Sequence, residues 1–140
     1  MPVHKPLAIL GTVLGLALPV TARQSAMTEQ DYRKAMTEIQ LLVGDANQHI
    51  DSGYWPDLQE DMDKITRQFN VVEKFWTARG TTAAVVFARS AIKATEPVQV
   101  AASQMDGQAA RRALGGLQVT CQGCHKQFRE ETADGFRITP

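Results

Sequence analysis

The sequence has few cysteines and few aromatic side chains. Its two cysteines, Cys121 and Cys124, lie three residues apart, and aromatic residues make up only 6% of the 140-residue chain. Neither charge is in excess, with 15 Lys+Arg against 15 Asp+Glu, so nothing indicates binding to nucleic acid or to an anionic membrane surface. The 44% apolar content excludes a disordered chain, and the length suits one domain. Abundant Ala, Gln and Glu favour helices over strands.

The N-terminal segment has the three parts of a secretory signal. Lys5 gives a positive start, residues 7–18 are apolar, and Pro19 precedes small residues that end at Ala22. The alternative is a membrane anchor, but an anchor takes about 20 apolar residues and this stretch is shorter. We therefore expect residues 1–22 to be a signal peptide. Residues 23–140 would then be the mature domain, periplasmic and without stable membrane insertion.

Four segments after the signal have the apolar periodicity of amphipathic helices. In the first, for example, Tyr32, Met36, Ile39, Val43, Ala46 and Ile50 recur at alternating steps of four and three. The segments span about 28–52, 57–78, 82–105 and 107–131. Such helices with short connections predict an all-α antiparallel four-helix bundle. Residues 132–140 are expected to form an irregular tail, with Phe136 as the one residue that folds back.

Capping residues and prolines set the expected helix limits. Thr28 and Asp57 are predicted N-caps, each with an acidic residue three positions on. Gly53 and then Pro56 are expected to stop the first helix. Pro97 lies inside the third segment, where the apolar phase continues, which favours one kinked helix over two shorter ones. The charged residues from Glu60 to Lys64 are expected on a solvated face.

The motif Cys121-Gln122-Gly123-Cys124-His125 predicts covalent attachment of one haem c. On a helix, positions i and i+3 share a face, so both thiols reach one edge of a haem and form thioethers with its vinyl groups. His125 follows on the same side, where its imidazole binds the iron. A thiol redox site would need a strand–helix–strand context, and a zinc site a second Cys/His cluster. Gly123 is expected to make room for the haem, and Gly115-Gly116 indicate either helix fraying or a close approach.

With Phe128 and Arg129, the motif becomes Cys-x-x-Cys-His-x-x-Phe-Arg. This pattern resembles the class II c-type cytochromes, which comprise cytochrome c-prime and its low-spin relatives. Tyr32-Arg33 resembles the common Tyr-Arg start of that family. The resemblance implies a haem near the C-terminal end of the fourth helix, with Phe128 and Arg129 beside it, and it makes a homodimer an expectation. Pro97 and the residues after Glu131 depart from the family pattern.

The residue opposite His125 decides the ligand set of the iron. In an antiparallel bundle, Met36 of the first helix lies at a similar height to His125, because each helical residue rises 1.5 Å. A methionine sulfur there would give a six-coordinate haem suited to electron transfer. Counted from Tyr32, Thr37 is the alternative position, and the iron site would then be open. Met27 lies before the helix, and His49 is expected to be a surface or core residue.

The sequence therefore predicts a periplasmic monohaem cytochrome that passes single electrons between periplasmic redox partner proteins. The alternative is a five-coordinate haem protein, similar to cytochrome c-prime, that binds NO or other small gases. An enzyme is not expected, because a distal acid–base residue is missing. Trp76, like Phe128, is expected to pack in the haem pocket.

Overall fold

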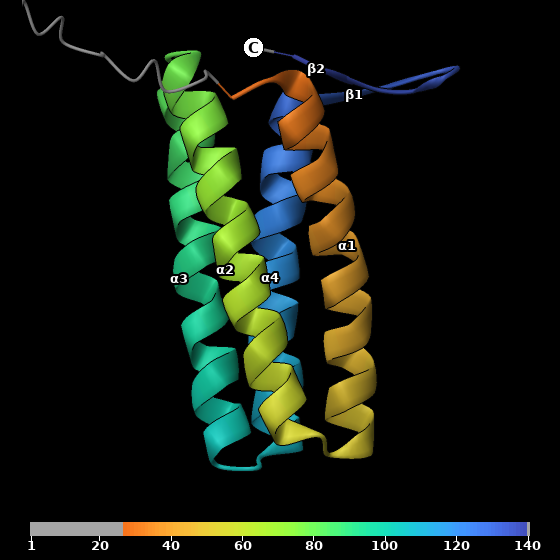
Figure 1. Cartoon of the computed structure of the whole chain (residues 1–140), viewed down its shortest axis with the longest axis vertical. Helices are drawn as coiled ribbons and strands as arrows, with labels where there is room; N and C mark the ends of the chain where they lie inside the picture. Colours follow the sequence, from red (N-terminus) through yellow and green to blue (C-terminus); the bar gives the residue numbers. More distant parts are fainter. Residues whose placement is uncertain (1–26, 140) are drawn as a thin grey trace, which may run out of the picture.

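The computed structural model describes residues 27–139, which form four long helices and a short hairpin (Figure 1). The elements are α1 (Glu29–Ser52), α2 (Trp55–Ala78), α3 (Thr82–Ser103), α4 (Gly107–Phe128), β1 (Arg129–Thr132) and β2 (Gly135–Ile138). Consecutive helices run in opposite directions, which confirms the predicted four-helix bundle. The predicted signal peptide lies outside the described residues. Among residues 27–139, no helix is long and apolar enough to cross a membrane.

The first helix begins and ends where the sequence predicts. The Thr28 hydroxyl accepts a hydrogen bond from the backbone N–H of Asp31, and the Asp31 carboxylate accepts one from the backbone N–H of Thr28. This reciprocal capping box satisfies two amide groups at the helix start, and it lowers the pKa of Asp31. At the other end, Gly53 adopts a φ of 69°, a left-handed conformation that glycine accepts at little cost.

The second helix begins two residues earlier than predicted. It starts at Trp55, so Pro56 lies in its first turn and does not terminate the preceding helix. A proline is tolerated there because the amide groups of the first turn have no partner within the helix. The assignment of Asp57 as the N-cap was therefore wrong. Only Gly53 and Tyr54 connect α1 to α2, which holds the two helices as antiparallel neighbours.

The third helix continues through Pro97, as the unbroken apolar phase predicts. Proline lacks an amide hydrogen, so one helical hydrogen bond is missing at this point. The buried Thr95 hydroxyl donates to the backbone carbonyl of Ile92 at 2.7 Å and lies 3.0 Å from the hydroxyl of Thr66 on α2. This polar contact joins α3 to α2 close to the missing bond.

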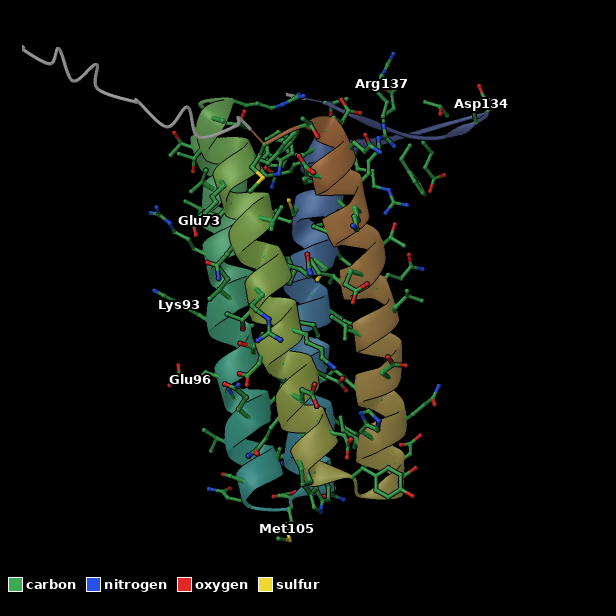
Figure 2. All side chains as sticks on the ribbon, in the orientation of Figure 1. Glu73, Lys93, Glu96, Met105, Asp134 and Arg137 are labelled. Atoms are coloured by element: carbon green, nitrogen blue, oxygen red, sulfur yellow. The ribbon has the colours of Figure 1, made fainter. Side chains whose placement is uncertain are left out.

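The core is continuous along the bundle, and its helix pairs are packed unequally. The largest fully buried side chains are Trp76, Phe75, Leu58, Met62, Ile65, Leu114, Leu117 and Val98. Close packing joins α1 to α2, α2 to α3 and α3 to α4, whereas α1 and α4 contact each other much less. Figure 2 shows the charged side chains of Glu73, Lys93 and Glu96 projecting outward from this core.

The C-terminal residues form a hairpin and not an irregular tail. The fourth helix ends at Phe128, short of the predicted limit near Glu131, and the chain continues directly into β1. Strands β1 and β2 pair in antiparallel register, with Arg129 opposite Ile138. The backbone N–H of Thr139 donates to the carbonyl of Phe128 at 3.0 Å, which holds the end of the hairpin against the end of α4. Figure 1 shows the hairpin projecting across that end of the bundle.

Candidate haem site

A cavity of about 640 Å³ lies at the end of the bundle that carries the hairpin. Residues from all four helices and from β2 line it, with the first half of α1 and the last half of α4 contributing most of the wall. Sites for small molecules and cofactors have volumes of about 300–1,000 Å³. The cavity therefore has the size of a cofactor site, and it lies between α1 and α4, which contact each other little.

The three predicted haem-binding residues all face this cavity. Cys121, Cys124 and His125 line it from α4, and each is half-buried. Both cysteines are free thiols. Burial raises the pKa of Cys121, and burial together with the neighbouring Cys121 raises the pKa of Cys124 to about 11. Reactive redox cysteines have a lowered pKa, so this environment does not favour the thiol redox alternative.

The environment of His125 suits a neutral imidazole. Burial lowers the pKa of His125, and the nearby charge of Arg129 lowers it further. The closest guanidinium nitrogen of Arg129 is 3.5 Å from Nδ1 of His125. A metal binds the neutral form of histidine, so this side chain is in the state needed to ligate iron. The haem motif requires two thiols for attachment and an imidazole for the iron, and all three lie on one wall of the cavity. The site therefore fits a haem.

The first helix presents Met36 and Thr37 to the same cavity. The predicted apolar stripe of α1 was partly wrong, because Ala35 and Leu42 fill the core, whereas Met36 and Val43 are half-buried and line the cavity. The buried face of α1 turns toward α2, its main packing partner, and this leaves Met36 at the edge of that face.

Thr37 uses its hydroxyl within its own helix. Its Oγ1 donates to the backbone carbonyl of Arg33 at 3.1 Å. The Met36 thioether is a weak acceptor and has no such competing demand. Of the two side chains, Met36 is therefore the one better placed to offer a donor atom to the cavity.

The predicted aromatic residues divide between the cavity wall and the layer behind it. Phe128 is buried and lines the cavity, as expected. Trp76 does not line it, so its prediction as a pocket residue was wrong. The centroid of its ring lies 5.8 Å from that of the Tyr32 ring and 5.4 Å from that of the Phe128 ring. Both Tyr32 and Phe128 line the cavity. Trp76 thus supports the wall from within the core. Among the described residues, its buried indole N–H has no hydrogen-bond partner.

The protein contacts at the glycines of α4 differ from one glycine to the next. A Cβ atom on Gly123 would lie 2.9 Å from Cε1 of Phe87, so this glycine allows a close approach between α4 and a ring of α3. At Gly115 and Gly116 an added Cβ would meet nothing within 4 Å among the described residues. Both glycines lie inside a continuous helix, so neither fraying nor close contact explains them here.

Two other candidates do not line the cavity, whereas three residues of β2, a strand that was not predicted, do. His49 instead pairs with Asp61, 2.7 Å away, and Met27 packs against the core. Phe136, which was expected to fold back, lines the wall together with Arg137 and Ile138 of β2. An alternation of apolar and polar residues directly after Gly135 was the available sequence signal for this strand.

Comparison with known proteins identifies the family. The family model described as Cytochrome C' matches residues 22–129, which is more than half of the chain. No curated protein and no solved structure matches the chain significantly. The matched region contains the Cys-x-x-Cys-His motif and the four helices whose ends enclose the cavity. The chain belongs to the cytochrome c-prime family, and it is a c-type haem protein.

Proposed function

We propose that this protein is a periplasmic monohaem cytochrome that transfers single electrons. The haem is held covalently by Cys121 and Cys124, with His125 and Met36 as the iron ligands. One observation carries the proposal. Met36 from the first helix lines the same cavity as both thiols and the imidazole from the last helix.

The chain's own residues prepare the site in three ways. The half-buried thiols stay protonated until they form thioether bonds with the haem, because burial raises their pKa. Phe128 and Tyr32 supply buried apolar surface that keeps water from the cavity, and burial raises the pKa of the Tyr32 hydroxyl to about 12. The guanidinium of Arg129 lies beside His125. The bound haem supplies the one-electron change of its iron, at a potential that a Met/His ligand pair raises.

A second function is supported by the family match and by the polar side chains of the same wall. If the Met36 sulfur only packs, the iron keeps an open position that binds NO or another small gas. Thr37 and Gln40 line the cavity next to Met36, so such a ligand would meet side chains that can form hydrogen bonds.

Covalent attachment is tested by denaturing the exported protein in acid acetone. We expect the colour to remain with the polypeptide, because thioether bonds survive this treatment. In the double variant Cys121→Ala/Cys124→Ala we expect the pigment to be extracted or absent. Free pigment from the parent protein would contradict the proposal. The His49→Ala variant is the control, because His49 is remote from the cavity, and it should retain its colour.

The ligand set is tested by absorption spectra of the ferrous protein with and without CO. A Met/His pair predicts sharp low-spin bands and little response to CO. In the Met36→Ala variant we expect broad high-spin bands that shift on addition of CO, whereas Thr37→Ala should retain the parent spectrum. High-spin bands in the parent that shift on addition of CO would favour the open-site alternative. An unchanged low-spin spectrum on loss of Met36 would show that Met36 is not the ligand.

Export and association are further parts of the proposal. We expect the mature chain to begin near Arg23 after removal of residues 1–22, which N-terminal sequencing of the periplasmic protein would test. We also expect a homodimer, as the family resemblance implies, and sedimentation of the haem-loaded protein would distinguish it from a monomer. Periplasmic redox proteins are the expected partners.

A further inference from the structure

The C-terminal hairpin supplies a part of the cavity wall that the four helices leave open. Phe136, Arg137 and Ile138 of β2 line the same cavity as Cys121 and His125. The family match ends at Arg129, so these three residues lie beyond the matched region. The hairpin therefore adds a feature of this chain to the site that the bundle provides.

The hairpin depends on the bundle for its order. An isolated two-stranded hairpin of this length is marginally stable at best in water. Here the guanidinium of Arg33 on α1 donates to the backbone carbonyl of Phe136 at 3.0 Å, and Ile138 packs against the core. The hairpin thus bridges the first and last helices, which otherwise contact each other little.

A close contact within the hairpin, between β1 and β2, lies beside the predicted iron ligand. The guanidinium carbon of Arg129 lies 3.0 Å from the centre of the Phe136 ring. The same guanidinium has a nitrogen 3.5 Å from Nδ1 of His125. Phe136 therefore holds in place the side chain that lies next to the imidazole. Phe136 is 44% exposed and also lines the cavity, so this part of the hairpin lies between the cavity and the surface.

We propose that Phe136 and Ile138 are haem-contacting residues, and that the hairpin is the wall that excludes water from this side of the haem. This inference rests on the proposed haem site. Burial of a haem in apolar surroundings disfavours its more highly charged ferric form, so a better closed wall raises the reduction potential. Contact with the haem also stabilises the hairpin, because the haem replaces empty space with packing partners.

The first test compares uncharged variants, so that only the apolar wall changes. Phe136→Ala/Ile138→Ala should lower the haem reduction potential while the covalent haem content stays at the parent level. The control is Leu41→Ala/Val119→Ala, which removes two exposed apolar side chains from α1 and α4 that do not line the cavity. The control should keep the parent potential. Equal potentials in all three proteins would overturn the proposal.

The second test requires no variant. Trypsin cleaves after Arg137, whose side chain is exposed on the hairpin, and intact mass reports the loss of the last three residues. We expect this cleavage to be several-fold slower in the haem-loaded protein than in the same chain produced without haem. Equal rates would overturn the proposal. Absence of covalent haem from the exported parent would instead refute the proposed function, so the two failures are distinguishable.

Discussion

Nδ1 of His49 lies 2.7 Å from a carboxylate oxygen of Asp61, and this pair joins α1 to α2 in the half of the bundle remote from the cavity. The Asp61 side chain is only 5% exposed, although it belongs to the charged run from Glu60 to Lys64 that was expected to face solvent. Burial raises the pKa of Asp61, and the hydrogen bond from His49 partly offsets this effect. The charged form of this carboxylate therefore lowers the stability of the folded protein.

The Asp61→Asn variant should gain stability relative to the parent as the pH rises. Between the ordinary pKa of 3.8 and the higher folded value, the folded chain keeps a proton that the unfolded chain has lost. Parent stability therefore falls through this window, and the cost persists above it. Urea unfolding between about pH 3 and about pH 6 would measure the difference. Asp63→Asn, which changes an exposed carboxylate on the same helix, should show no comparable trend.

Substituting two glycines of α4 by alanine should have opposite effects. Gly116→Ala should stabilise the protein by about 0.5–1 kcal/mol, because alanine is the better helix former and the added methyl meets open space. Gly123→Ala should destabilise it by about 1–3 kcal/mol, because the methyl displaces Phe87.

Chemical denaturation of the haem-loaded variants would measure both glycine effects. Adding Phe87→Leu to Gly123→Ala should recover part of the loss. Equal stabilisation by the two alanines would show that the Phe87 ring moves aside without cost.

Replacing Pro97 by alanine should raise the thermal midpoint. The substitution restores the amide hydrogen that α3 lacks and removes the clash of the ring with the preceding turn, which together contribute up to about 3 kcal/mol. The adjacent exposed Glu96 provides the control, since Glu96→Ala should change stability by less than about 0.5 kcal/mol. A lower midpoint in Pro97→Ala would mean that the bundle is built around a bend at this position.

Local signals in the sequence were sufficient to predict the four helices, apart from some of their ends, and the shared cavity wall of Cys121, Cys124 and His125. The Thr28 capping box, Gly53 and the spacing of Cys121, Cys124 and His125 act within one or two helical turns. Their consequences therefore do not depend on the rest of the fold. The continuation of the helix through Pro97 was also predicted correctly, because the apolar phase on both sides of it is a local property.

Features that depend on packing between distant segments were missed. Met36 was expected opposite His125, and it lines the same cavity, but its place on the core stripe was wrong because α1 packs against α2 more closely than against α4. Trp76 lies behind the wall because Tyr32 and Phe128 lie between it and the cavity. The hairpin was missed because its strands are four residues long and gain their order from Arg33, about a hundred residues earlier in the chain. Of these features, only the hairpin leaves a local pattern, the short alternation of apolar and polar residues after Gly135.

The loose contact between the first and last helices has a consequence for assembly. The three tight helix pairs are neighbours along the chain, so each can form as a local helical hairpin without closing a long loop. Packing α1 against α4 is instead a long-range step, and it takes place across the cavity. A haem bound there would contact both helices and so join α1 to α4. Haem binding would therefore stabilise α1 and α4 more than α2 and α3.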